Sequence, residues 1–206
     1  ELVLILTMHT TLNYSPNFDL KKRKIKDIKF IVFHYTGMKN EKEVIRKLTD
    51  SNSKVSSHYL IKNNGKIVTL VPDLYIAWHA GISFWGKYKL LNINSIGIEV
   101  SNPGHKFKYK KFSKKQIFAI VKLSRFLIKK YKIKANNILG HSDIAPNRKI
   151  DPGEKFPWEY FSKKKIGYWH NLNKQQLLKE RRVDTSDLEK IKFIKNLYGI
   201  GYTKNI

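Results

Sequence analysis

Apolar and polar positions along this chain follow two periods, and together these predict its strands and helices. A continuous apolar run at residues 30–33 is typical of a strand covered on both faces. Two strand-like runs, 57–62 and 66–71, flank Asn63-Asn64-Gly65, and Asn-Gly between such runs favours a hairpin. At 95–100 apolar residues alternate with others, which predicts a strand carrying Glu99 on the face opposite its isoleucines.

Helical spacing occurs in two further segments of the first 140 residues. Asn40 can cap a short helix at 41–48, and Ser113 with Gln116 forms a capping box for a longer one that runs to Tyr131. This second helix leads into a short apolar strand at 138–139, giving a strand–helix–strand crossover. Its predicted inner stripe is apolar and belongs to the core: Ile117, Ile120, Val121, Ser124, Leu127, Ile128 and Tyr131.

The order of these elements predicts an α/β fold with a mixed central sheet flanked by helices. We divide the chain into a polar, solvated lead-in at 1–28, a main domain at 29–165 and a helical extension at 166–206. In the extension, Thr185 or Ser186 starts an amphipathic helix that Gly199 stops. The apolar stretch at 2–6 fits either a strand or the remnant of a secretory signal.

Composition narrows the function classes. The formal charge of +25 invites a nucleic-acid interpretation, but only six of the 41 basic residues are arginine and the lysines are spread along the chain. No recognition helix or RNA-binding aromatic motif appears, so we expect no specific nucleic-acid function. No apolar run is long enough to span a membrane. Because cysteine is absent, any metal must be bound by His, Asp or Glu.

Polar residues follow three separate predicted strands. His34, Glu99 and His141 each lie at or near a strand end, and Lys149 and Asp151 follow in the loop beyond. Two imidazoles and a carboxylate are a recurring ligand set for a catalytic zinc ion. His58 and His79 are the alternative partners of His34 in an all-histidine site, although their surroundings favour hydrogen-bonded positions in the pocket wall.

These residue types also predict a reaction. A glutamate outside the ligand set, Glu99, can take a proton from a zinc-bound water and deliver it to a leaving amine. Lys149 is suited to stabilising an oxyanion on the attacked carbonyl. The reaction class that these residues predict is metal-assisted hydrolysis of an amide. No HExxH pair and no G-x-S-x-G elbow occurs, which excludes the helix-borne metalloprotease and the serine hydrolase arrangements.

Five segments carry a resemblance to a known family. The segments are His34-Tyr35-Thr36, residues 55–60, Ala77-Trp78-His79-Ala80-Gly81, Asn92 with residues 95–99, and residues 140–153. With these segments the chain resembles the zinc-dependent N-acetylmuramoyl-L-alanine amidases of the amidase-2 group, whose fold is shared with peptidoglycan recognition proteins. The resemblance implies that His34, His141 and Asp151 bind one zinc, that Glu99 is the general base and that Lys149 is the oxyanion cation. Trp78, His79 and Asn92 are our candidates for substrate-binding residues.

The resemblance also implies substrate and place of action. The expected substrate is peptidoglycan or its fragments, with a muramic acid in either the reducing or the 1,6-anhydro form. Residues 156–158 and 166–169 look closest to the larger, envelope-associated branch of the group, so we expect the cell envelope, with the cytoplasm as the alternative. Residues 183–202 resemble the beginning of that branch's peptidoglycan-binding module. Leu90-Leu91 stands where the family often has an arginine for a stem-peptide carboxylate. The alternative function is a recognition module without catalysis, and the oligomeric state stays open.

Overall fold

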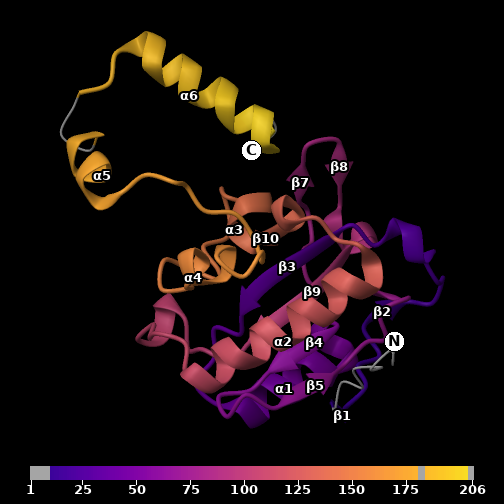
Figure 1. The fold of residues 1–206 in the computed structure, drawn as a ribbon. Coiled ribbons are helices and arrows are strands. Elements are labelled where there is room, and N and C mark those ends of the chain that lie inside the picture. The colour runs from indigo at the N-terminus through magenta and orange to yellow at the C-terminus, as the bar shows by residue number, and fades with distance from the viewer. Residues whose placement is uncertain (1–9, 181–183, 204–206) are drawn as a thin grey trace, which may run out of the picture.

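A six-stranded mixed sheet forms the centre of the computed structural model, which describes residues 10–180 and 184–203 (Figure 1). The strand order is β1-β5-β4-β9-β3-β10. Strands β4, β9, β3 and β10 run parallel, and β5 is antiparallel to β4, so the predicted mixed sheet is confirmed. The strands are β1 (Thr11–Leu12), β3 (Phe30–Tyr35), β4 (Tyr59–Ile61), β5 (Ile67–Thr69), β9 (Ser95–Val100) and β10 (Ile138–Gly140).

Two small ribbons stand apart from this sheet. One pairs β2 (Phe18–Asp19) with β6 (Ile76–Ala77), and the other pairs β7 (Phe84–Trp85) with β8 (Tyr88–Lys89). The helices are α1 (Glu41–Thr49), α2 (Lys114–Tyr131), α3 (His141–Ile144), α4 (Trp158–Ser162), α5 (Lys174–Glu180) and α6 (Asp187–Ile200). None of the helices described has both the length and the apolarity that a membrane span requires.

Helix α2 covers one face of the sheet, as the crossover predicts (Figure 1). Ser113 and Gln116 close its amino end in a reciprocal capping box. Its buried stripe includes the predicted Ile120, Ser124, Leu127 and Tyr131, and it packs on the isoleucines of β9. Ala119 and Leu123 are also buried, whereas Ile117, Val121 and Ile128 are only partly buried.

The opposite face of the sheet carries the polar residues of interest. His34 of β3 pairs with Glu99 of β9, and strand alternation places both on the side away from α2. Below them on the same side, Phe30 and Val32 pack against Leu91 and Ile144. The site therefore lies where apolar packing gives way to polar side chains at the carboxyl ends of β3, β9 and β10.

Three expectations from the sequence need correction. The lead-in is only partly solvated, because Ser15, Asn17 and Arg23 are buried among its exposed residues and Arg23 donates to backbone carbonyls of the main domain. Helix α6 runs through Gly199 to Ile200, and Gly201 caps it. Residues 77–86, interpreted as a loop, contribute to both small ribbons. The apolar stretch at 2–6 lies outside the described residues.

Candidate metal centre and active site

Three side chains converge at the carboxyl end of β3 and β10. His34 is in β3, His141 directly follows β10, and Asp151 returns from the loop after α3. Gly140 of β10 pairs with Phe33 of β3 in a parallel register, so the next residue of each strand, His141 and His34, lies side by side. The topology alone thus brings together two residues that are 107 positions apart.

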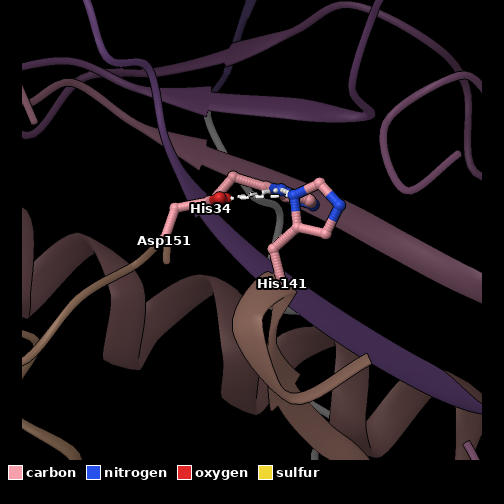
Figure 2. A group of neighbouring side chains, drawn as sticks. All are labelled: His34, His141 and Asp151. Carbon is pink, nitrogen blue, oxygen red and sulfur yellow. Dashed lines mark hydrogen bonds and ion pairs between the residues drawn. The ribbon is translucent and has the colours of Figure 1, made fainter. Parts of the chain in front are cut away.

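The donor atoms of these residues form a tight triangle (Figure 2). His34 Nδ1 lies 2.9 Å from His141 Nδ1, and each lies 3.1 Å from Asp151 Oδ2. All three residues are buried. We call them the metal cluster.

A backbone carbonyl fixes the tautomer of His141. Its Nε2 lies 3.0 Å from the oxygen of Ala80, which can only accept, so Nε2 carries the proton and donates it. In a neutral imidazole Nδ1 then has no proton. Its lone pair points toward the centre of the metal cluster.

A chain of three hydrogen bonds fixes the tautomer of His34. Ser95 Oγ donates to the carbonyl of Leu91 at 2.5 Å, so it accepts from His79 Nε2–H at 3.1 Å. Deprotonated His79 Nδ1 then accepts from His34 Nε2–H at 3.0 Å. His34 Nδ1 is left with a lone pair, like that of His141.

With both imidazoles neutral, His34 Nδ1, His141 Nδ1 and Asp151 Oδ2 face one another as three acceptors. Burial and the neighbouring His141 lower the pKa of His34 to about 4, so its ring is neutral near pH 7. Buried acceptors normally face donors, and a cation satisfies three lone pairs at once. Two imidazole nitrogens and one carboxylate oxygen fit a zinc ion, which binds such atoms at about 2 Å.

Glu99 stands beside the metal cluster on the neighbouring strand. Among the described residues its buried Oε2 has no hydrogen-bond partner. Burial, and then the charge of Asp151, raise the pKa of Glu99 to about 8. A buried carboxyl group with a free oxygen and a pKa near neutrality is suited to exchanging protons.

Lys149 supplies a positive charge to the same region. It is partly buried, and its charge lowers the pKa of both Glu99 and His34, although burial dominates each shift. The structure thus brings together all five residues that the sequence predicted for catalysis and metal binding: His34, His141, Asp151, Glu99 and Lys149.

The three predicted substrate-binding residues have partners within the protein. Trp78 Nε1 donates to Asp19 at 2.7 Å. Asn92 Oδ1 accepts from the backbone N–H groups of His79 and Ala80 at 3.1 and 2.7 Å. His79 is buried between His34 and Ser95. Their contact with substrate stays a prediction.

Several residues that shape the site were not found from the sequence. Ser95 and the Ala80 carbonyl set the tautomers, and a single serine or backbone oxygen leaves no sequence signal. Close packing requires glycine at position 97, because a Cβ there would overlap the ring of His79. Its place between two isoleucines of a strand was the one available signal.

Comparison with known proteins gives a consistent answer. The family profile described as N-acetylmuramoyl-L-alanine amidase (Amidase_2) matches residues 24–154. The N-acetylmuramoyl-L-alanine amidase AmiD of Escherichia coli is 38% identical over 85% of this chain and 67% of its own length. The 1,6-anhydro-N-acetylmuramyl-L-alanine amidase AmpD of Haemophilus influenzae is 36% identical over 71% of this chain and 87% of its own length.

Solved structures agree with the sequence relatives. Escherichia coli AmiD, in complex with the substrate anhydro-N-acetylmuramic acid-L-Ala-D-γ-Glu-L-Lys, superposes with a TM-score of 0.73 at 37% identity, covering 86% of this chain and 72% of AmiD. AmpDh3 of Pseudomonas aeruginosa, in complex with an anhydromuramic pentapeptide, also has a TM-score of 0.73, at 27% identity, with 97% and 80% of the two chains covered.

Proposed function

This chain belongs to the N-acetylmuramoyl-L-alanine amidase family and has that amidase activity, and from this premise we propose that a zinc ion held by His34, His141 and Asp151 supports catalysis. The observation that carries the proposal is the convergence of three buried acceptor atoms within about 3 Å. Their fixed tautomers leave a cation as the partner that satisfies all three.

A zinc ion bound here would lower the pKa of a water molecule and polarise the carbonyl of the lactyl group. Glu99 takes the proton of the attacking water and passes it to the amine of L-alanine as the carbon–nitrogen bond breaks. Burial raises its pKa to about 8 in the metal-free protein, and the charge of a bound zinc ion would lower that pKa, so that the carboxylate could accept a proton near neutral pH. Lys149 stabilises the negative charge that develops on the carbonyl oxygen.

The peptide of the substrate would fit beside the site, at the carboxyl ends of β3 and β9. A cavity of about 570 Å³ is bounded there by Thr36 and Ser101, which directly follow these strands and lie two residues beyond His34 and Glu99. Four lysines also line it: Lys39, Lys106, Lys108 and Lys110. These cations suit the carboxylates of a stem peptide, a role for which the sequence lacks the family's arginine.

The three candidate substrate-binding residues take different roles in this proposal. Trp78 remains the one that contacts substrate, because its ring is only partly buried. His79 positions His34, and Asn92 holds the backbone of residues 79–80. We propose both anhydro and reducing-end muropeptides as substrates, and the anhydro-muramic ligands in the AmiD and AmpDh3 complexes support the anhydro form.

Mass-spectrometric analysis of purified muropeptides tests the proposal. Both sugar forms are incubated with the protein as prepared, after chelation, and after addition of zinc. We expect free stem peptide beginning at L-alanine, lost on chelation and restored by zinc. Cleavage that persists after exhaustive chelation would contradict the zinc assignment. Cleavage of one sugar form alone would fix the specificity.

Domain organisation and location follow the same resemblance. We propose that the amidase domain spans residues 29–165, that the buried part of the preceding segment packs with it, and that residues 166–206 form a helical extension. The family match to 24–154 supports this division. We place the protein in the cell envelope, on its similarity to the larger branch of the group. Cell fractionation with an antibody against the chain tests this, and recovery in the cytoplasm would contradict it.

A further inference from the structure

The carboxyl end of α6 returns to the amidase domain, although most of that helix is exposed. Leu188, Ile191 and Phe193 are each more than 60% exposed, and α6 has no buried residue. Figure 1 shows its last turn reaching the β7–β8 ribbon. Contact between the helix and the domain is therefore concentrated in the residues that follow it, Gly201 and Tyr202, which we call the C-terminal contact.

The C-terminal contact is closely packed on the β7–β8 ribbon. Gly86 N–H donates to the carbonyl of Gly201 at 2.6 Å. The ring of Tyr202 lies 5.0 Å from that of Trp85 in an edge-to-face arrangement, and a Cβ at Gly201 would overlap the Trp85 indole. This fit requires a glycine at position 201.

Tyr202 also reaches the helix that begins with a metal ligand. Its hydroxyl donates to Asp143 Oδ1 at 2.9 Å, and Asp143 Oδ2 accepts the Gly140 N–H at 2.7 Å. Asp143 thereby closes the first turn of α3, whose first residue is His141. Tyr202 thus holds the carboxylate of Asp143, which in turn stabilises the first turn of α3.

The C-terminal contact also adjoins the second group that orients His141, the carbonyl of Ala80. The carbonyl of Ala80 accepts from His141 Nε2 and sets its tautomer, and it belongs to the segment that continues into Trp85 and Gly86. Gly201 and Tyr202 thus contact both structures that orient the His141 imidazole. Tyr202 contacts α3 through Asp143, and Gly201 contacts the β7–β8 ribbon, which follows Ala80 in the chain.

From this arrangement we infer that Tyr202 is a positioning residue for His141, through which the C-terminal extension strengthens metal binding in the amidase domain. The inference rests on the proposed zinc site. A side chain bonded directly to a metal ligand typically contributes 10- to 100-fold in affinity. Tyr202 acts one bond further out, so its removal should weaken zinc binding by roughly 3- to 10-fold.

The test compares Tyr202→Phe, which keeps the ring and removes the hydroxyl, with Tyr198→Phe on the exposed face of α6. Zinc affinity is measured by competition with a chromogenic chelator, and the Co²⁺-substituted proteins are compared by visible absorption. We expect Tyr202→Phe alone to bind zinc more weakly and to shift the Co²⁺ spectrum. Asp143→Asn should weaken binding too, and the double variant should show less than the sum of the two effects.

Three results would overturn the inference, and they are distinguishable. If the unaltered chain binds no zinc, the proposed function fails and the positioning role fails with it. If the unaltered chain binds zinc and Tyr202→Phe binds it equally well with an unchanged Co²⁺ spectrum, only the positioning role is wrong. A lowered thermal midpoint with unchanged zinc affinity also contradicts it, because it shows that Tyr202 only anchors the extension.

Discussion

Two buried clusters of histidine and aspartate adjoin the His79 ring, and they differ in how their acceptors are used. The metal cluster contains His34, whose ring centroid is 5.1 Å from that of His79. The second, which we call the arginine cluster, consists of Arg23, His58 and Asp73, and the centroid of its His58 ring lies 5.7 Å from that of His79. Similar residue types thus occur twice within a short distance.

In the arginine cluster the acceptors face donors. Asp73 accepts from Tyr59, Tyr131 and Lys130 at 2.6, 2.5 and 2.9 Å. His58 Nδ1 accepts from the Gly97 N–H at 3.0 Å. The guanidinium of Arg23 donates to four backbone carbonyls, those of Asp73, Asn92, Ile93 and Ser95. Donors of the protein itself satisfy these acceptors, so the network stabilises the fold.

In the metal cluster acceptors face acceptors, and the neighbouring Glu99 has an oxygen without a partner in the described part of the chain. Burial of histidine and acid together therefore does not identify a functional site. A functional site is identified instead by buried acceptors that no donor of the protein satisfies.

The largest expected effect separates the two clusters directly. Asp151→Asn keeps the shape of the side chain and removes its negative charge, so zinc binding should weaken and amidase activity should fall at least roughly 1000-fold. Asp73→Asn is the matched change in the arginine cluster and should leave the zinc stoichiometry at one. Metal analysis and muropeptide turnover measure both. Equal loss of zinc in the two variants would show that the clusters are not functionally distinct.

The next effect concerns the unpartnered carboxyl group. Glu99→Gln should lower kcat by about 10²- to 10⁴-fold because the proton acceptor is lost, while zinc remains bound. A variant that keeps both zinc and full activity would show that Glu99 is not the base. A variant that loses zinc would instead place Glu99 among the ligands.

The third effect is on stability and its pH dependence. Burial alone would raise the pKa of Asp73, yet hydrogen bonds from Tyr131, Tyr59 and Lys130 hold it below its usual value. A lowered folded-state pKa contributes stability that is present above the unfolded pKa of about 4 and is lost as the pH falls through the folded value. Asp73→Asn should cost about 2–3 kcal/mol at pH 7 and flatten the acid limb of stability below pH 4. Urea unfolding from pH 7 to pH 3 measures this, and parallel curves would contradict it.

The contrast between the clusters also explains which features could be predicted from the sequence. Strand ends, capping boxes and the Asn64-Gly65 turn are local signals, and the fold they predicted is confirmed. His34 and His141 were predicted as ligands at strand ends, and they meet because β3 and β10 are parallel and align their carboxyl ends. Arg23 was assigned to a solvated segment because a polar run carries no periodicity when hydrogen bonds alone bury it.

Tautomers and positioning lie beyond a sequence pattern. The Ala80 carbonyl is contributed by a backbone atom, which every residue type has. The pairing of Tyr202 with Asp143 depends on how the extension folds back over 59 residues, and no local period records it.

The weakest of these predicted effects concerns His79, whose ring adjoins both clusters. Gly97→Ala places a methyl group against the ring of His79, which must then move from the position in which it accepts from His34. Because His79 sets the tautomer of His34, zinc affinity should fall about 10-fold even though no ligand is altered. Gly199→Ala in α6 is the control, since a Cβ there meets nothing within 4 Å. Chelator competition measures both variants. If Gly97→Ala lowers stability but binds zinc as tightly as the control, His79 serves packing alone, and the hydrogen-bond chain from Leu91 to His34 does not determine the properties of the metal cluster.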